Sequence, residues 1–246
     1  MKVIPRRFDE AIKAGYRLKP TLAEAVRIIN KHFKGFNIAV LVRDLENLLK
    51  SYAKEPVEKE IYVSEPPPTL RIEYKSENCF DEKEGLYVSR TITHENDELV
   101  AYHEMLMLPE SSRKQGLGKK IIAAFLEQYE NMEVKRINLY AALSDGGAAW
   151  AKFGFKAAKR SEMERILLIT EQSLGEKSKI LKVVRDTFNN YYEKEPDGKA
   201  FPIQNWVAIP GMETILKKAD SHWHGCMDLT NSKDLLNFKH YVGQKR

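Results

Sequence analysis

The chain has 246 residues, of which 43% are apolar and 30% charged, and its formal net charge is +5. This is the composition of a globular protein, long enough for one large domain or two small ones, without internal repeats or low-complexity tracts. The two cysteines, Cys79 and Cys226, lie far apart, which argues against a disulfide framework and against a paired-cysteine metal site.

No segment approaches the roughly 20 apolar residues that span a bilayer, and the N-terminal MKVIPRRFDE lacks the apolar stretch of a signal peptide. We therefore expect a cytoplasmic protein with no membrane partner. Charge is unevenly distributed, with +6 over 1–34, −8 over 35–110, +6 over 111–160 and +1 over 161–246. RNA is a possible partner of the basic blocks, but no interleaved aromatic residues support it.

Residues 1–54 are expected to form a helical N-terminal segment. One helix opens at Pro20 and Thr21, and the run NIAVLVRDLENLLKSYA spaces its apolar residues by threes and fours. Residues 55–68 are rich in Glu, Lys and Pro, and the prolines at 66–68 can neither continue a helix nor sit within a sheet. We therefore predict a linker over 55–68.

Three β-rich runs follow, at 69–75, 85–93 and 98–108, and the polar segments between them predict an antiparallel meander. A helix is expected over about 115–130, with its apolar residues on one face. A β-like run at 134–142 and a short helix come next. A strand, a helix and a second strand in this order are typical of a crossover that makes two strands parallel.

The last part of the chain is expected to hold a helical insertion at about 161–219. The segment 223–229 then alternates like a strand, and residues 231–242 predict a capped helix. The fold class predicted for the chain is α+β, with a central mixed sheet flanked by helices, and its main domain would span 69–246.

A glycine-containing loop, RKQGLG over 113–118, precedes the helix predicted at 115–130. The first amides of a helix lack intrahelical partners and carry the positive end of the dipole, so a helix start bared by Gly116 and Gly118 predicts an anion-binding site. A Walker loop is excluded because no glycine stands at position 113. A dinucleotide fingerprint is excluded because Ile121 occupies the place of its third glycine.

The string at 113–118 resembles motif A of the GCN5-related N-acetyltransferases, Arg/Gln-x-x-Gly-x-Gly/Ala. About 30 residues further on, WAKFGF over 150–155 is similar to the second block of that family, in which a Tyr is followed by two or three residues and Gly-Phe. The order of the expected elements around the two motifs is also the order of the family. The resemblance covers about residues 69–158 and the strand expected at 223–229.

The resemblance implies that acetyl-CoA is the co-substrate and that it lies where two parallel strands part. The strand end Met105–Leu108 would offer unpaired backbone groups to the pantetheine, and the amides of Lys114–Gly118 would hold the diphosphate. The residues that the resemblance implies in cofactor binding are Leu106, Met107, Leu108, Arg113, Lys114, Gln115, Gly116, Leu117, Gly118, Lys119, Trp150 and Phe153.

Acetyl transfer to an amine needs a general base and a proton for the leaving thiolate. A carboxylate on the strand before the loop is a recurrent base in the family, which favours Glu104, whereas His103 has the better free pKa; strand alternation lets only one of them face the cleft. Many family members protonate the thiolate with the Tyr of the second motif. This chain has Trp150 there, and Ser144 and Tyr140 are the nearest polar candidates, although Ser144 could equally cap a helix.

His222, His224 and Cys226 share one face of the strand expected at 223–229. Three ligands in a line would spread over about 13 Å, which is too far for one tetrahedral ion. No metal is therefore expected.

The leading hypothesis is an acetyl-CoA-dependent N-acetyltransferase that acts on an amine of a protein, an aminoacyl-tRNA or a small molecule. The alternative is a catalytically weak module of the same fold that binds CoA or a macromolecular partner, which Trp150 favours. Residues 1–54 and the insertion at 161–219 could select the acceptor, bind a partner or form the interface of a homo-oligomer.

Overall fold

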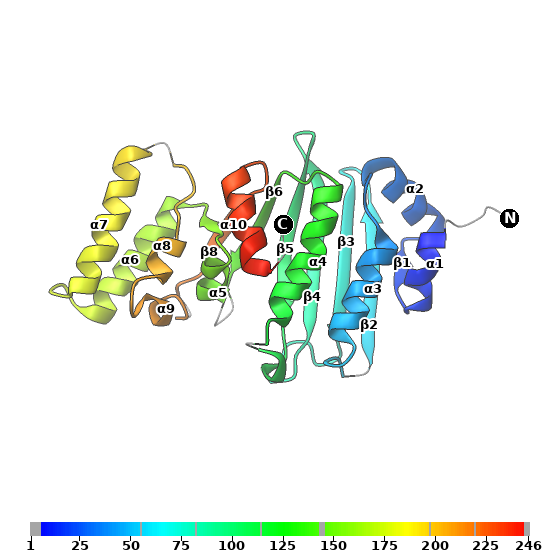
Figure 1. Ribbon diagram of the computed structural model, residues 1–246, viewed down its shortest axis with the longest axis horizontal. Coiled ribbons are helices and arrows are strands. Elements are labelled where there is room, and N and C mark those ends of the chain that lie inside the picture. The colour runs from blue at the N-terminus through cyan, green and yellow to red at the C-terminus, as the bar shows by residue number, and fades with distance from the viewer. Residues whose placement is uncertain are drawn as a thin grey trace. The chain divides into compact units, whose positions relative to one another are not determined.

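The computed structural model describes residues 6–54, 56–81, 83–113, 115–142, 146–196, 198–218 and 220–243 (Figure 1). The chain divides into two compact units. The first comprises Met1–Ile137 with Lys239–Arg246, and the second comprises Asn138–Phe238. Over the described ranges, every helix is too short or too polar to cross a lipid bilayer.

The first unit contains a sheet with strand order β1-β2-β3-β4-β5. β1 and β2 are parallel, and the remaining neighbours are antiparallel, so the sheet is mixed. The chain is therefore an α+β protein with a mixed sheet and flanking helices, as the sequence predicts at this level. The elements of this unit are α1 (Arg6–Lys13), β1 (Arg17–Lys19), α2 (Leu22–His32), α3 (Ile38–Leu49), β2 (Val57–Ser64), β3 (Thr69–Ser76), β4 (Tyr87–Glu95), β5 (Glu98–Met107), the 3-10 turn η1 (Glu110–Ser112) and α4 (Leu117–Asn131).

The N-terminal segment is mainly helical, with the short strand β1 as an exception that the sequence does not predict. The predicted linker at 55–68 is wrong, because Val57–Ser64 forms β2 and pairs along its length with β3. The error arises from the prolines at 66–68, which lie in the turn after the strand and not within it. Their effect on the backbone is confined to that turn.

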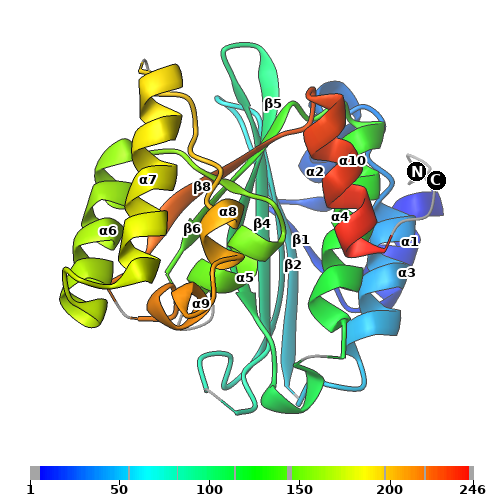
Figure 2. The same cartoon turned by 60° about the vertical axis from the view of Figure 1, so that its left-hand side comes forward.

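Helices α3 and α4 lie side by side on one face of the first unit's sheet (Figure 2). α3 begins where the Asn37 side chain accepts a hydrogen bond from the amide of Val40 at 3.3 Å, as an N-cap does. The apolar face predicted for α4 is buried, which confirms it. The members of that face are Ile121, Ile122, Phe125, Leu126 and Tyr129.

The hairpin of β4 and β5 contains a β-bulge. Ser89 pairs with Met105, whereas the next residue, Arg90, pairs with His103, so Glu104 is an extra residue on β5. A bulge leaves such a residue out of the ladder and changes the direction of the side chains around it. This irregularity lies three residues before the end of β5, next to the turn that leads into α4.

In the second unit the strand order is β6-β8-β7, with β7 and β8 antiparallel. The insertion predicted at about 161–219 is helical, and α6 and α7 form a pair of adjacent helices (Figure 1). The elements are β6 (Arg136–Ala141, which begins in the first unit), α5 (Gly146–Lys152), β7 (Lys156–Ala157), α6 (Arg160–Leu174), α7 (Lys179–Lys194), α8 (Gln204–Val207), α9 (Met212–Ile215), β8 (Trp223–Asp228) and α10 (Ser232–Val242, which ends in the first unit).

Candidate functional site

The start of α4 is bare of side-chain caps. Gly116 is the N-cap residue with φ 78°, a left-handed conformation that favours glycine, and no side chain caps the first turn in the described part of the chain. A helix that begins in this way leaves its first four amides, those of Gly116 to Lys119, without intrahelical acceptors. These amides and the helix dipole together favour an anion at this end of α4.

Gly118 has no local structural reason to be glycine. A Cβ on this residue would lie 3.5 Å from Leu108 Cδ1 and 3.9 Å from Leu106 Cδ2, which are ordinary van der Waals distances. Its φ is not in the left-handed region, and a glycine within a helix costs about 0.5–1 kcal/mol relative to alanine. The small gap between α4 and the end of β5 is therefore left open at a cost to stability.

In the turn before α4, some backbone amides already donate hydrogen bonds to carbonyls of the same turn. The Gln115 amide donates to the carbonyl of Ser112 at 3.3 Å, and the Arg113 amide donates to the carbonyl of Glu110 at 3.1 Å. The Arg113 side chain also donates from Nε to the carbonyl of Leu108 at 3.3 Å. Anion-binding amides are expected at 114–118, but the amide of Gln115 already has an acceptor. The amides of Gly116 to Lys119, at the start of α4, are therefore the better candidates. Lys114 lies outside the described residues.

Arg113 and Lys119, two of the cations that the resemblance implies in cofactor binding, differ in their surroundings. Arg113 is exposed. The ammonium of Lys119 lies 3.9 Å from the centre of the Tyr241 ring, which is a close cation–π contact. Arg113 is therefore the more accessible of these two cations.

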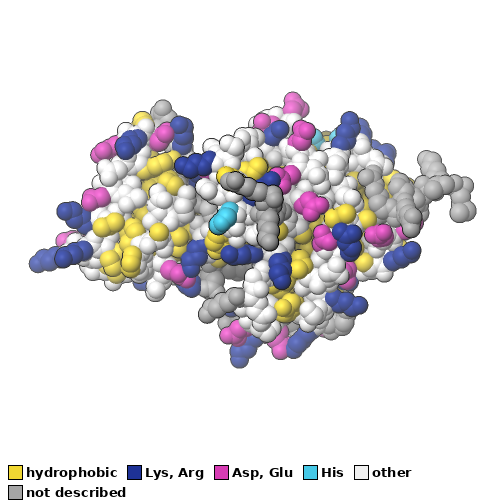
Figure 3. Space-filling model, in the orientation of Figure 1, with side chains coloured by type: hydrophobic (Ala, Val, Ile, Leu, Met, Phe, Trp, Pro, Cys, Tyr) yellow, Lys and Arg dark blue, Asp and Glu magenta, His cyan; other side chains and the backbone are white. Residues whose placement is uncertain are grey.

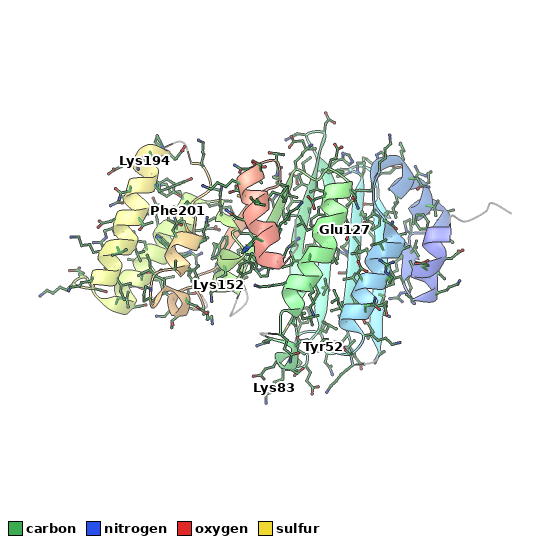
Figure 4. The ribbon with its side chains drawn as sticks, viewed as in Figure 1. Tyr52, Lys83, Glu127, Lys152, Lys194 and Phe201 are labelled. Carbon is green, nitrogen blue, oxygen red and sulfur yellow. The ribbon has the colours of Figure 1, made fainter. Side chains whose placement is uncertain are left out.

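A hollow of about 430 Å³ adjoins the turn before α4. Tyr52 and Lys83 mark it in Figure 4. The Tyr52 hydroxyl donates to Oε1 of Gln115 at 3.3 Å, which joins the hollow to the glycine loop. Acidic and basic side chains are mixed at this tip of the first unit (Figure 3). The hollow is lined by Tyr52, Lys54, Lys83, Glu84, Pro109, Glu110 and Ser111, so its formal charges cancel.

The end of β5 presents apolar side chains beside the start of α4. Leu106, Met107 and Leu108 are all partly exposed, although they are apolar and follow a strand whose middle is buried. The contacts that a Cβ on Gly118 would make with Leu106 and Leu108 place this strand end against the first turn of the helix. The two features form one apolar and amide-rich surface.

Glu104 lies on the outer face of the first unit's sheet, opposite the face that α4 covers. It is exposed, and the buried Ser89 hydroxyl donates to its Oε2 at 2.8 Å. A second carboxylate, Glu73 on β3, is only 8% exposed and lies 3.5 Å from the same hydroxyl. The Tyr87 hydroxyl donates to Oε1 of Glu73 at 2.6 Å. A polar network across three strands therefore holds the Glu104 carboxylate in place.

Tyr87 acts in this network as a donor. Burial and the hydrogen bond to Glu73 raise the pKa of its phenol to about 12, so the hydroxyl keeps its proton at neutral pH. Glu73 also accepts from Arg71 at 3.3 Å. Because Glu73 has partners on both oxygens, Glu104 is the carboxylate of the network that remains available to a solute.

His103 lies on the other face of the same strand, under α4. It is 3% exposed, and its Nε2 is 3.1 Å from the Tyr129 hydroxyl. Burial, with a smaller effect from Arg90, holds the pKa of His103 well below its ordinary value, so the ring is neutral at physiological pH. His103 is therefore enclosed in the core, and the expected division of the two residues between opposite faces is confirmed.

Tyr140 lies in the second unit, where two histidines contact its ring. It is 46% exposed, and its ring centre lies 4.6 Å from that of His224 and 5.4 Å from that of His222. Nδ1 of His224 is 2.6 Å from Oε1 of Glu162, and the His224 amide donates to Oε2 at 2.7 Å. This pair orients an imidazole whose ring is half exposed. Ser144 lies outside the described residues.

Trp150 and Phe153 belong to an aromatic cluster of the second unit. The Trp150 ring centre lies 5.4 Å from that of Phe153 and 5.3 Å from that of Phe155. Phe155 in turn packs on Phe238 at 5.7 Å. Among the described residues, the structure contains no group of three His, Cys, Asp or Glu side chains that could hold a metal ion.

Sequence reasoning missed the residues that surround Glu104. Glu73 stands inside the β-rich run TLRIEYK, and a carboxylate is uncommon in the middle of a strand, so its presence there indicates a polar site. Ser89 carries no such signal. Glu162 was also missed, because it lies 62 positions from His224.

A scan of the chain against known protein families, curated proteins and solved structures finds no match. The function is therefore inferred from the residues themselves.

Proposed function

We propose that the chain is an acetyl-CoA-dependent N-acetyltransferase that transfers an acetyl group to an amine. The observation that carries the proposal is Gly118, a glycine in the first turn of α4 that the local fold does not require. A ligand that passes between α4 and the end of β5 explains why a side chain is absent there. The resemblance of residues 113–118 and 150–155 to the two acetyltransferase motifs supports the same ligand.

The residues of the first unit fit the parts of coenzyme A. The amides of Gly116 to Lys119 suit a diphosphate, and the exposed Arg113 adds a positive charge. The apolar side chains of Leu106 to Leu108 suit the pantetheine arm. When bound, acetyl-CoA supplies the thioester that is attacked by the amine. Leaving Gly118 without a side chain allows the ligand to approach the backbone closely.

Glu104 is the general base of the proposal. An amine acceptor is protonated at neutral pH and must lose a proton before it attacks the thioester. The Glu104 carboxylate is exposed and oriented by Ser89, so it can accept this proton directly or through one water. It also attracts a cationic acceptor to the outer face of β5. His103 has no such access.

The test is the replacement Gly118→Ala. The new methyl group makes ordinary contacts with Leu106 and Leu108, so we expect the free energy of unfolding to rise by about 0.5–1 kcal/mol. Because that methyl group fills the space assigned to the ligand, calorimetry should show a Kd for CoA at least tenfold higher. Asn190→Ala is the matched control, because it improves an exposed position in α7 and should leave the CoA affinity unchanged. Unchanged affinity in Gly118→Ala would contradict the proposal.

A second candidate function is a non-catalytic module that binds CoA. It is favoured by Trp150, whose indole contacts the rings of Phe153 and Phe155 and cannot donate an acidic proton. In acetyltransferases with the similar motif, a Tyr at this place often protonates the leaving thiolate. Release of free thiol from acetyl-CoA, measured with a panel of primary amines, separates the two functions. Binding without thiol release on any amine would favour the module.

A further inference from the structure

Arg90 is a charged residue in the core of the first unit. It lies in β4, it is 0% exposed, and its guanidinium lies 5.4 Å from the centre of the Phe125 ring of α4. Burial lowers the pKa of Arg90 to about 10, so the side chain is still protonated at neutral pH. The fold therefore contains a positive charge that has been removed from water.

This charge is poorly compensated. Arg90 forms no ion pair with a carboxylate of the described residues, and its Nε and Nη2 atoms have no hydrogen-bond partner there. Burying a charge is unfavourable unless it is paired and hydrogen-bonded, and an apolar side chain of similar volume would often serve stability as well or better. The role of Arg90 therefore lies in the hydrogen bonds of Nη1, the third nitrogen of its guanidinium.

Nη1 of Arg90 contacts the bulge. It donates to the carbonyl of Ser89 at 2.7 Å and to the carbonyl of Met105 at 2.5 Å. Ser89 and Met105 are the paired residues on one side of the register shift, and Arg90 and His103 are the pair on the other side. The guanidinium thus links both strands at the point where Glu104 leaves the ladder.

The bulge decides which face Glu104 occupies. Residues directly opposite in an antiparallel pair point to the same face, so a regular ladder after the Ser89–Met105 pair would place Glu104 opposite Arg90. Glu104 would then share the buried face of Arg90, and His103 would turn outward. With the extra residue in place, Glu104 is exposed and His103 is buried.

We propose that Arg90 is a positioning residue that holds this bulge and so keeps the Glu104 carboxylate on the outer face of the sheet. The role of Glu104 as a general base rests on the proposed function. The placement of its carboxylate by Arg90 is independent of that function. Arg90 acts through the carbonyls of Ser89 and Met105 and does not contact the substrate. Burying the Arg90 charge is unfavourable for stability, and this role in positioning Glu104 explains why the charge is present.

The experiment compares Arg90→Met with Gln128→Met. Methionine resembles arginine in length and carries no charge, so it removes the two carbonyl contacts and keeps the packing. Gln128 is a second buried polar residue of the same core; it accepts from the Asn37 amide at 2.8 Å, and this hydrogen bond does not involve the bulge. Amide hydrogen exchange over His103–Leu106, global unfolding, and kcat and KM for acetyl-CoA are measured for both.

In Arg90→Met we expect amide exchange over His103–Leu106 to accelerate at least tenfold, beyond any change in global unfolding. We expect kcat for acetyl transfer to fall at least tenfold and KM for acetyl-CoA to change less than twofold, because the amides of Gly116 to Lys119, which are assigned to the diphosphate, lie outside the loosened segment. Gln128→Met should lower stability without accelerating exchange over this segment beyond the global change. Arg90→Lys, which retains the charge but offers a point-like donor, should accelerate exchange at least threefold.

Unchanged exchange over His103–Leu106 in Arg90→Met would overturn the proposal, whether or not the protein transfers acetyl groups. If Arg90→Met does not fold, unchanged exchange in Arg90→Lys would overturn it equally. Faster local exchange in a protein whose wild type shows no acetyl transfer would support the role of Arg90 and reject the proposed function. The two claims can therefore fail separately.

Discussion

The outer and inner faces of the β4–β5 hairpin carry polar groups in very different environments. On the outer face, Glu104 is exposed and Ser89 hydrogen-bonds to it. On the inner face, Arg90 and His103 are enclosed beneath α4. Both faces carry an ionisable side chain on β5, but only the outer carboxylate can exchange protons with a solute. The comparison teaches that access, and not free pKa, selects between neighbouring candidates for a general base.

The largest expected effect is on the outer face. Glu104→Gln keeps the shape of the side chain and the hydrogen bond with Ser89 but removes the proposed base. We expect kcat for acetyl transfer to fall by about 10²-fold or more, with the Kd for CoA unchanged. Steady-state kinetics and calorimetry measure the two quantities. Wild-type turnover in this variant would show that the base lies elsewhere.

The inner face should govern stability at acid pH. The pKa of His103 is lowered in the folded protein, so below the unfolded value of about 6.5 the unfolded state binds a proton that the folded state does not. The free energy of unfolding should therefore fall as pH drops below about 6.5, by up to about 1.4 kcal/mol per pH unit from this residue. His103→Gln should remove that part of the slope in urea titrations at several pH values. An identical slope in the variant would contradict the assignment.

A smaller effect is expected where the network holds Glu104. Ser89→Ala removes the hydroxyl that donates to Glu104 at 2.8 Å and should cost about 1 kcal/mol of stability. The carboxylate remains but is less well oriented, so we expect kcat to fall several-fold, by less than in Glu104→Gln. Thermal unfolding and steady-state kinetics provide the comparison. A loss as large as that of Glu104→Gln would contradict a purely orienting role for Ser89.

Local patterns predicted most of the elements. Apolar spacing indicates α3 and α4, and alternating β-rich runs indicate β3 to β5, because these signals lie within each segment. β1 could not be predicted in this way. It has three residues, and its pairing with β2 joins residues about 43 positions apart, such as Arg17 and Glu60. Nothing in its local sequence specifies that partner.

The candidate site was predictable only in part. The glycine loop is visible in the sequence because the backbone conformation at Gly116 depends on its own residue type. The bulge at Glu104 depends instead on how β5 aligns with β4, and the approach of Glu73 depends on how β3 aligns with β4. Register is a property of the paired strands, so one strand's sequence does not reveal it.

The central claim is that the first amides of α4 bind a diphosphate. Calorimetry with CoA and with pantetheine, which lacks the diphosphate and the nucleotide attached to it, tests it most directly, and phosphopantetheine isolates the contribution of phosphate. The account predicts that CoA binds at least tenfold more tightly than pantetheine and that increasing the salt concentration narrows the difference. Equal affinities for the two compounds, or no affinity for CoA, would contradict it.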